Sequence, residues 1–174
     1  MLMIKVLAAS LPKEWELYVK EHPAQKLAHG NNYTPFRWKG FFETIGTLPN
    51  VRLVPIDTNT FELGAKAKVV ATISGTAGWE AIVRGTPALV FGYPWFMHAP
   101  GILRVSSVAE CREALEKVEK GFKPDTAELL GYLALVDKVS FRGYLNVYSK
   151  GIAKFDEKTA VHEMHKAFLS AIAP

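Results

Sequence analysis

Short apolar runs alternate with longer stretches of mixed character along the first two thirds of the chain. The third and fourth runs are almost continuous in apolar residues, as expected for strands covered on both faces in a parallel sheet. Strands that alternate with helical stretches at this spacing predict an α/β fold with a parallel sheet flanked by helices. The predicted strands cover residues 15–19, 51–54, 68–73, 88–91 and 102–105.

Between and after these runs, apolar residues recur at the spacing of an α-helix. Asp57 precedes the first predicted helix as an N-cap candidate, and Ser106 or Ser107 precedes the third. On the third helix Cys111 falls on the apolar face, which predicts a thiol packed in the core. The predicted helices cover residues 58–67, 76–84, 107–120, 126–139 and 159–171.

Length and composition predict a single domain over residues 1–174, with the helices of about 126–171 at its C-terminal end. The 174 residues are 49% apolar and 22% charged, which fits a chain with a full hydrophobic core. No apolar run reaches the roughly 20 residues that span a bilayer, and no secretory signal pattern opens the chain. With Cys111 as the single cysteine, these features favour a reduced, cytoplasmic location.

The net charge of +4 comes from lysines and arginines that are scattered rather than clustered. Because they do not interleave with aromatic residues, the sequence predicts no nucleic-acid groove. The charge is compatible with an anionic small molecule or an anionic membrane surface. His162 and His165 lack the four-residue spacing of a zinc-binding helix, so we expect no metal site.

Polar residues follow several predicted strands at the point where each strand ends. In an open parallel sheet, ligands bind beyond the carboxyl ends of the strands, so these residues are candidates for one shared site. Lys20 and His22 follow the first strand, and the Ser74-Gly75-Thr76 turn follows the third. The aromatic loop Tyr93-Pro94-Trp95 follows the fourth strand, where it could stack a base or a sugar ring, or cover the sheet edge by packing alone.

The Ser74-Gly75-Thr76 turn joins a strand to a helix, an arrangement that favours phosphate through free backbone N–H groups and the helix dipole. It is neither a Walker loop nor a dinucleotide fingerprint. The alternative is that Ser74 or Thr76 only caps the helix. Neither residue has Glu or Gln three residues later, so the sequence contains no capping box here. Glu80 instead lies one helical turn beyond Thr76, on the same side of the helix. Its carboxylate could accept hydrogen bonds from sugar hydroxyls, or it could be a solvated helix glutamate.

His22 lies directly before Pro23, which favours an extended backbone at the end of the first strand. An imidazole at this edge could donate to a phosphate or act as a general acid, which makes His22 the candidate catalytic residue. Strand alternation places Lys20 on the same side, where it would add positive charge. A purely structural histidine is the alternative.

The order of these pieces is similar to that of a known family. The segments 19–23, 48–51, 74–81, 84–87 and 92–96 together resemble capsule polysaccharide biosynthesis proteins. These are bacterial glycosyltransferases of the GT-B type, including Kdo transferases that use CMP-Kdo. The His-Pro pair and the Ser-Gly-x-x-x-x-Glu arrangement are also similar to UDP-N-acetylglucosamine 2-epimerases. The resemblance spans about residues 15–118.

The resemblance implies a Rossmann-like donor-binding domain, which is one half of a GT-B fold. It assigns His22, Ser74, Gly75 and Thr76 to the phosphates of a CMP- or UDP-linked sugar, and Glu80 to the ribose. The saccharide or glycolipid acceptor and the catalytic base would lie on a missing N-terminal domain or a partner chain. The isolated chain is therefore expected to be inactive, without a cofactor, in the cytoplasm or at the periphery of the inner membrane.

Two other functions remain open at this point. A sugar-nucleotide 2-epimerase would use a similar fold for a different reaction. A domain without catalysis could bind a sugar nucleotide or a partner and support polysaccharide assembly or export. Binding of nucleotides to the chain distinguishes these possibilities in part.

Overall fold

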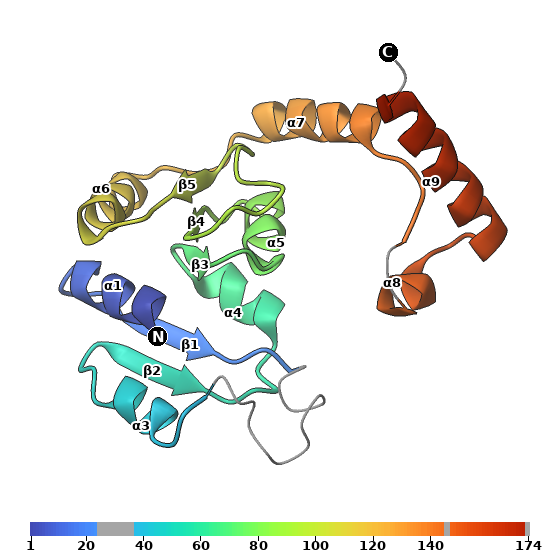
Figure 1. Cartoon of the computed structure of the whole chain (residues 1–174). Coiled ribbons are helices and arrows are strands. Elements are labelled where there is room, and N and C mark those ends of the chain that lie inside the picture. The colour runs from blue at the N-terminus through green and yellow to red at the C-terminus, as the bar shows by residue number, and fades with distance from the viewer. Residues whose placement is uncertain (24–36, 145–146, 173–174) are drawn as a thin grey trace. The chain divides into compact units, whose positions relative to one another are not determined.

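The computed structural model describes residues 1–23, 37–144 and 147–172 (Figure 1). The chain divides into two compact units, Met1–Leu129 and Leu130–Pro174. Every candidate residue of the sheet edge falls in the first unit. The C-terminal helices predicted over about 126–171 are present as α7 (Thr126–Val139), α8 (Val147–Ile152) and α9 (Glu157–Ile172). The prediction of a single domain over residues 1–174 stays a prediction.

In the described part of the first unit, five short parallel strands form the sheets, and all five predicted strands are confirmed. Strand β1 pairs with β2, with Leu17 opposite Val51, and the second sheet has the order β3-β4-β5. All pairings are parallel, so the predicted α/β, Rossmann-like class is confirmed. The strands are β1 (Leu17–Lys20), β2 (Val51–Val54), β3 (Val70–Thr72), β4 (Ala88–Val90) and β5 (Ile102–Arg104).

The two sheets share one hydrophobic core. Leu17 of β1 and Ala71 of β3 both pack against the buried cluster that contains Leu89 of β4. Just before these strands, the Lys68 ammonium lies 4.9 Å from the centre of the Trp15 ring. Burial of apolar surface on both sheets therefore stabilises a single first unit. β4 is buried throughout, as its apolar sequence predicts, while β3 is half-buried.

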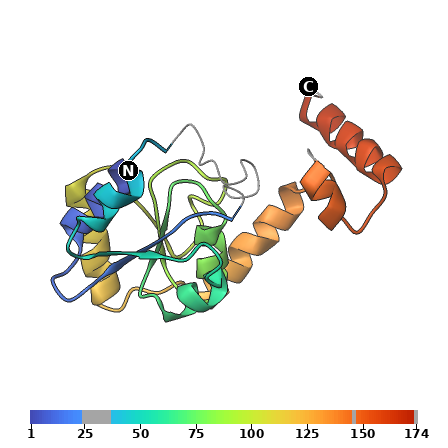
Figure 2. The same ribbon diagram turned by 90° about the horizontal axis from the view of Figure 1, so that it is seen from below.

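Helices lie on both sides of these strands (Figure 2). On one side, α1 (Leu2–Ser10) and α6 (Val108–Glu119) pack together, and the Ser10 hydroxyl donates to the Val108 carbonyl at 3.3 Å. The short helix α3 (Phe41–Gly46) packs beside α1 and β2. On the other side lie α4 (Thr60–Lys66) and α5 (Ala77–Val83). Cys111 of α6 is fully buried in the core, as predicted.

The starts of the helices confirm one predicted cap and correct another. The Ser107 hydroxyl accepts from the Glu110 amide at the start of α6, which selects Ser107 over Ser106 as the cap. The prediction of Asp57 as the cap of α4 is wrong. The side chain of Asn59 instead accepts hydrogen bonds from the amides of Phe61 and Glu62, so the helix begins at Thr60.

Candidate functional site

The turn after β3 is exposed, and its own strand holds it in place. The Gly75 amide donates to the Thr72 hydroxyl at 3.0 Å, and a Cβ on Gly75 would meet that oxygen at the same distance. Thr76 is the N-cap of α5 but its side chain makes no cap hydrogen bond, so the alternative that its hydroxyl only caps the helix is wrong. Ser74, Gly75 and Thr76 all face solvent beyond the end of β3. The turn therefore presents polar groups where the sequence predicts a ligand.

Glu80 lies one turn further along α5 and is bound to Thr76 at two points. Its amide donates to the Thr76 carbonyl at 2.8 Å, and the Thr76 hydroxyl donates to its Oε1 at 3.1 Å. Arg84 donates from Nη1 to the Glu80 carbonyl at 2.8 Å and stacks over the Phe61 ring of α4 at 4.3 Å. Within the described ranges, Glu80 forms no ion pair. The half-buried carboxylate is thus oriented by a hydroxyl rather than neutralised by a cation.

The aromatic loop after β4 lies directly beside the turn. A Cβ on Gly92 would come within 2.8 Å of the Ile73 carbonyl oxygen, so the two backbones are in close contact. In the loop, Tyr93 is 79% exposed and Trp95 is 57% exposed, whereas Pro94 is buried. The Arg104 guanidinium lies 5.1 Å from the centre of the Tyr93 ring. The predicted phosphate turn and the predicted aromatic surface therefore form one continuous edge.

Trp79 connects this loop to α5. Its ring centre lies 4.8 Å from that of Trp95, and Trp95 packs edge-on against Phe96 at 5.4 Å. Gly78 packs against the side chains of Thr72 and Phe96. Its absent Cβ therefore lets α5 lie close to the sheet.

Lys20 and His22 lie at the end of the other sheet. Lys20 is the last residue of β1, and its Nζ donates to the Glu21 carbonyl at 3.4 Å. The exposed His22 donates from its amide to Glu21 Oε1 at 3.3 Å. The Glu21 carboxylate is itself held by two hydrogen bonds from Arg37, at 2.9 and 3.1 Å. Sequence reasoning missed this pair because its partners stand far apart in the chain.

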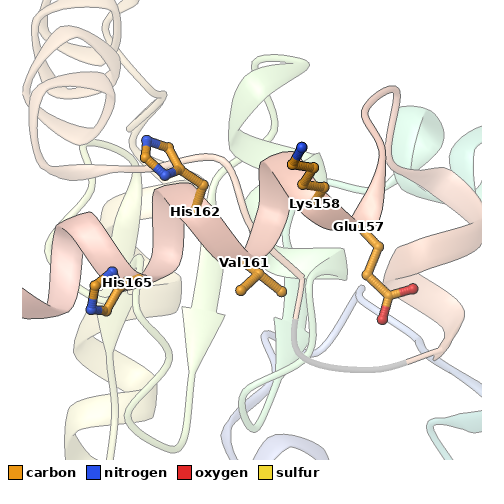
Figure 3. Close-up of a pocket in the computed structure, with 5 residues that line it drawn as sticks. All are labelled: Glu157, Lys158, Val161, His162 and His165. Carbon is orange, nitrogen blue, oxygen red and sulfur yellow. The ribbon is translucent and has the colours of Figure 1, made fainter.

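Other titratable side chains belong to elements outside the candidate site. A shallow hollow of about 560 Å³ runs along α9 and is lined by Glu157, Lys158, Val161, His162 and His165 (Figure 3). The rings of His162 and His165 point to different sides of the helix. In the part of the chain that the structure describes, no three His, Cys, Asp or Glu side chains form a group able to hold a metal ion. Burial raises the pKa of the Cys111 thiol.

The fold and the exposed edge define a class: a Rossmann-like α/β protein whose polar turn and aromatic loop follow adjacent parallel strands. The chain belongs to the capsule polysaccharide biosynthesis protein family, whose model matches residues 1–133. This match confirms the family resemblance, supports a role in capsule synthesis and contains every candidate residue from Lys20 to Trp95. Comparison with curated proteins and with solved structures gave no match. None of the helices that could be assessed is long and apolar enough to cross a membrane.

Proposed function

We propose that the first unit is the nucleotide-sugar-binding domain of a glycosyltransferase that builds capsular or surface polysaccharide. The observation that carries the proposal is the arrangement of Thr76 and Glu80 on α5, beside an exposed turn and inside the family match. Ser74 and Gly75 would contact the donor phosphates, and Glu80 would accept hydrogen bonds from the ribose. The aromatic loop would stack a base or a sugar ring.

The negative charge of Glu80 decides which part of the donor this residue would contact in the proposal. A carboxylate repels a phosphate directly, so Glu80 is better suited to the neutral hydroxyls of the sugar. In this proposal His22 and Lys20 would stabilise the charge that develops on the donor phosphate as the glycosidic bond breaks. The acceptor and the catalytic base would come from a second domain or a partner chain, so this chain alone would bind without transferring sugar.

Titration of the full chain with CMP, UDP and their sugar conjugates tests the proposal by calorimetry. Because hydrogen bonds to charged groups are worth about 1.5–3 kcal/mol, we expect Ser74→Ala and Glu80→Gln each to weaken binding by roughly tenfold or more. Glu43→Gln is the matched control, since Glu43 is an exposed glutamate in the first turn of α3. It should bind like the wild type.

Two results would contradict the proposal at different levels. Unchanged affinity in both Ser74→Ala and Glu80→Gln would mean that nucleotides bind elsewhere, so the assigned site would be wrong. No binding of any nucleotide would argue against the nucleotide-sugar function itself. Conversion of a UDP-sugar to its epimer without an acceptor would support the epimerase alternative instead.

A further inference from the structure

We infer that Thr76 is a positioning residue for Glu80, and that its hydroxyl sets the preference of the site for ribose over deoxyribose. The inference rests on the proposed function, because it concerns the carboxylate assigned there to the ribose. It also changes the role of Thr76, which the family resemblance assigned to the donor phosphates.

The first step is the direction of the hydrogen bond between the two side chains. A carboxylate oxygen only accepts, so at 3.1 Å the Thr76 hydroxyl must be the donor to Glu80 Oε1. A hydroxyl has one hydrogen, and this bond uses it. Phosphate oxygens also accept hydrogen bonds, so the Thr76 side chain cannot donate to a phosphate while it holds Glu80. Its bond to Glu80 and a bond to the donor phosphate are therefore mutually exclusive.

The second step is that, among the described residues, the Thr76 hydroxyl forms a hydrogen bond with Glu80 and none that caps the helix. Thr76 stands at the N-cap of α5, yet its side chain accepts no hydrogen bond from the first turn of that helix. Removing the hydroxyl should therefore leave the start of α5 intact, unlike the loss of a true cap, which costs about 1 kcal/mol. The effect of the hydroxyl should be confined to the carboxylate that it contacts.

The third step is that Glu80 is fixed at both ends. Arg84 bonds the Glu80 carbonyl and stacks on Phe61, which ties this part of α5 to α4. Thr76 fixes the other end, because its hydroxyl bonds one carboxylate oxygen. A small hollow of about 30 Å³ between α4 and α5 is lined by Glu80 and Arg84. A glutamate side chain fixed in this way could accept hydrogen bonds from the 2′- and 3′-hydroxyls of a ribose with little loss of side-chain entropy on binding.

The test measures how strongly the full chain prefers ribonucleotides. Calorimetric dissociation constants are measured for CMP and UMP and for their 2′-deoxy and 3′-deoxy forms. The ratio of the deoxy to the ribo constant reports the contribution of the hydroxyls. It compares two ligands on one protein, so a partial loss of folded chain cancels from it.

Four variants give the expected pattern. Glu80→Ala, which removes the acceptor oxygens altogether, should bring the ratio close to one. Thr76→Val, which keeps the branched shape without the hydroxyl, should lower the ratio by about two- to tenfold, the range expected for one lost hydrogen bond. Thr76→Ser should restore the wild-type ratio. Thr44→Val is the matched control, because exposed Thr44 donates to the carbonyl of Gly40, the N-cap residue of α3, at 2.7 Å, and it should leave the ratio unchanged.

The outcomes separate the inference from the proposed function. If Thr76→Val weakens the ribo and deoxy ligands by the same factor, Thr76 is a phosphate ligand and the inference is overturned. The inference is also overturned if Thr76→Val keeps the wild-type ratio of deoxy to ribo dissociation constants. It is overturned as well if Thr76→Ser lowers that ratio as much as Thr76→Val does. If the wild-type chain binds neither CMP nor UMP nor any of their deoxy forms, the proposed function fails and the inference falls with it.

Discussion

Replacing Gly92 by alanine tests how tightly the turn after β3 is held against the aromatic loop. The new Cβ would lie 2.8 Å from the Ile73 carbonyl oxygen and 3.1 Å from its Cγ2. Ordinary van der Waals contacts begin near 3.4 Å, so one backbone must move by about 0.6 Å. The Phe91 amide is bonded to the Thr72 carbonyl at 3.0 Å, which limits that movement. Overpacking of this kind costs about 1–3 kcal/mol, so we expect the free energy of unfolding to fall by that amount.

Urea unfolding followed by tryptophan fluorescence measures the effect, because two tryptophans lie close to the loop. Gly46→Ala is the control in the same unit. A Cβ there meets nothing within 4 Å, so the helix should gain about 0.5–1 kcal/mol. A shift of the Ile73 backbone should also displace Ser74 and weaken nucleotide binding. A Gly92→Ala chain as stable as the wild type would refute the argument that the two backbones cannot separate.

Two further predictions concern α6. Hydrogen bonds from Ser106 lower the pKa of Glu110 in the folded chain. The ionised carboxylate therefore stabilises the fold at a pH above its unfolded pKa of about 4.3. This stabilisation is lost as the pH falls through the lower pKa of the folded state. Glu110→Gln should therefore have a lower melting temperature than the wild type at pH 7, and this difference should disappear in acid. A difference in melting temperature that does not change with pH would contradict this. Cys111 should react with a thiol reagent far faster in urea than in the native chain, because burial shields the thiol and raises its pKa, and rapid native labelling at pH 7 would count against it.

The strands were predictable because each is a short apolar run bounded by turn residues, and such a pattern needs no knowledge of distant contacts. Helix α1 was not, because its sequence is apolar almost throughout and its N-cap, Met1, makes no side-chain bond. Its helical form depends on burial of Ile4 and Leu7 against other elements. The cap of α4 was misassigned because Asp57 and Asn59 are both good caps. The backbone conformation before the helix decides which of the two side-chain oxygens reaches the free amides in the first turn of α4.

The candidate site shows the same limit. The four-residue spacing of Thr76 and Glu80 predicts that they share one side of a helix, and the structure confirms it with a direct bond. The contacts of Arg84 with Phe61 depend on how two helices pack, which spacing along the chain does not reveal. The roles assigned to Lys20, His22 and the aromatic loop stay predictions, because they depend on a ligand.

The first compact unit and the segment matched by the family model have nearly the same boundaries, so the candidate site can be considered within the first unit alone. The first unit ends at Leu129 and the match ends at residue 133. Among the described residues, the hydrogen bonds that orient Glu80 come from Thr76 at the start of α5 and from Arg84 just after it, and Arg84 stacks on Phe61 of α4. The ring contacts reported for Trp79 and Trp95 also lie inside this unit. Geometry that arises within one compact unit, from neighbouring turns of one helix, does not depend on how the second unit is placed. The proposed ribose contact is thus a property of the first unit.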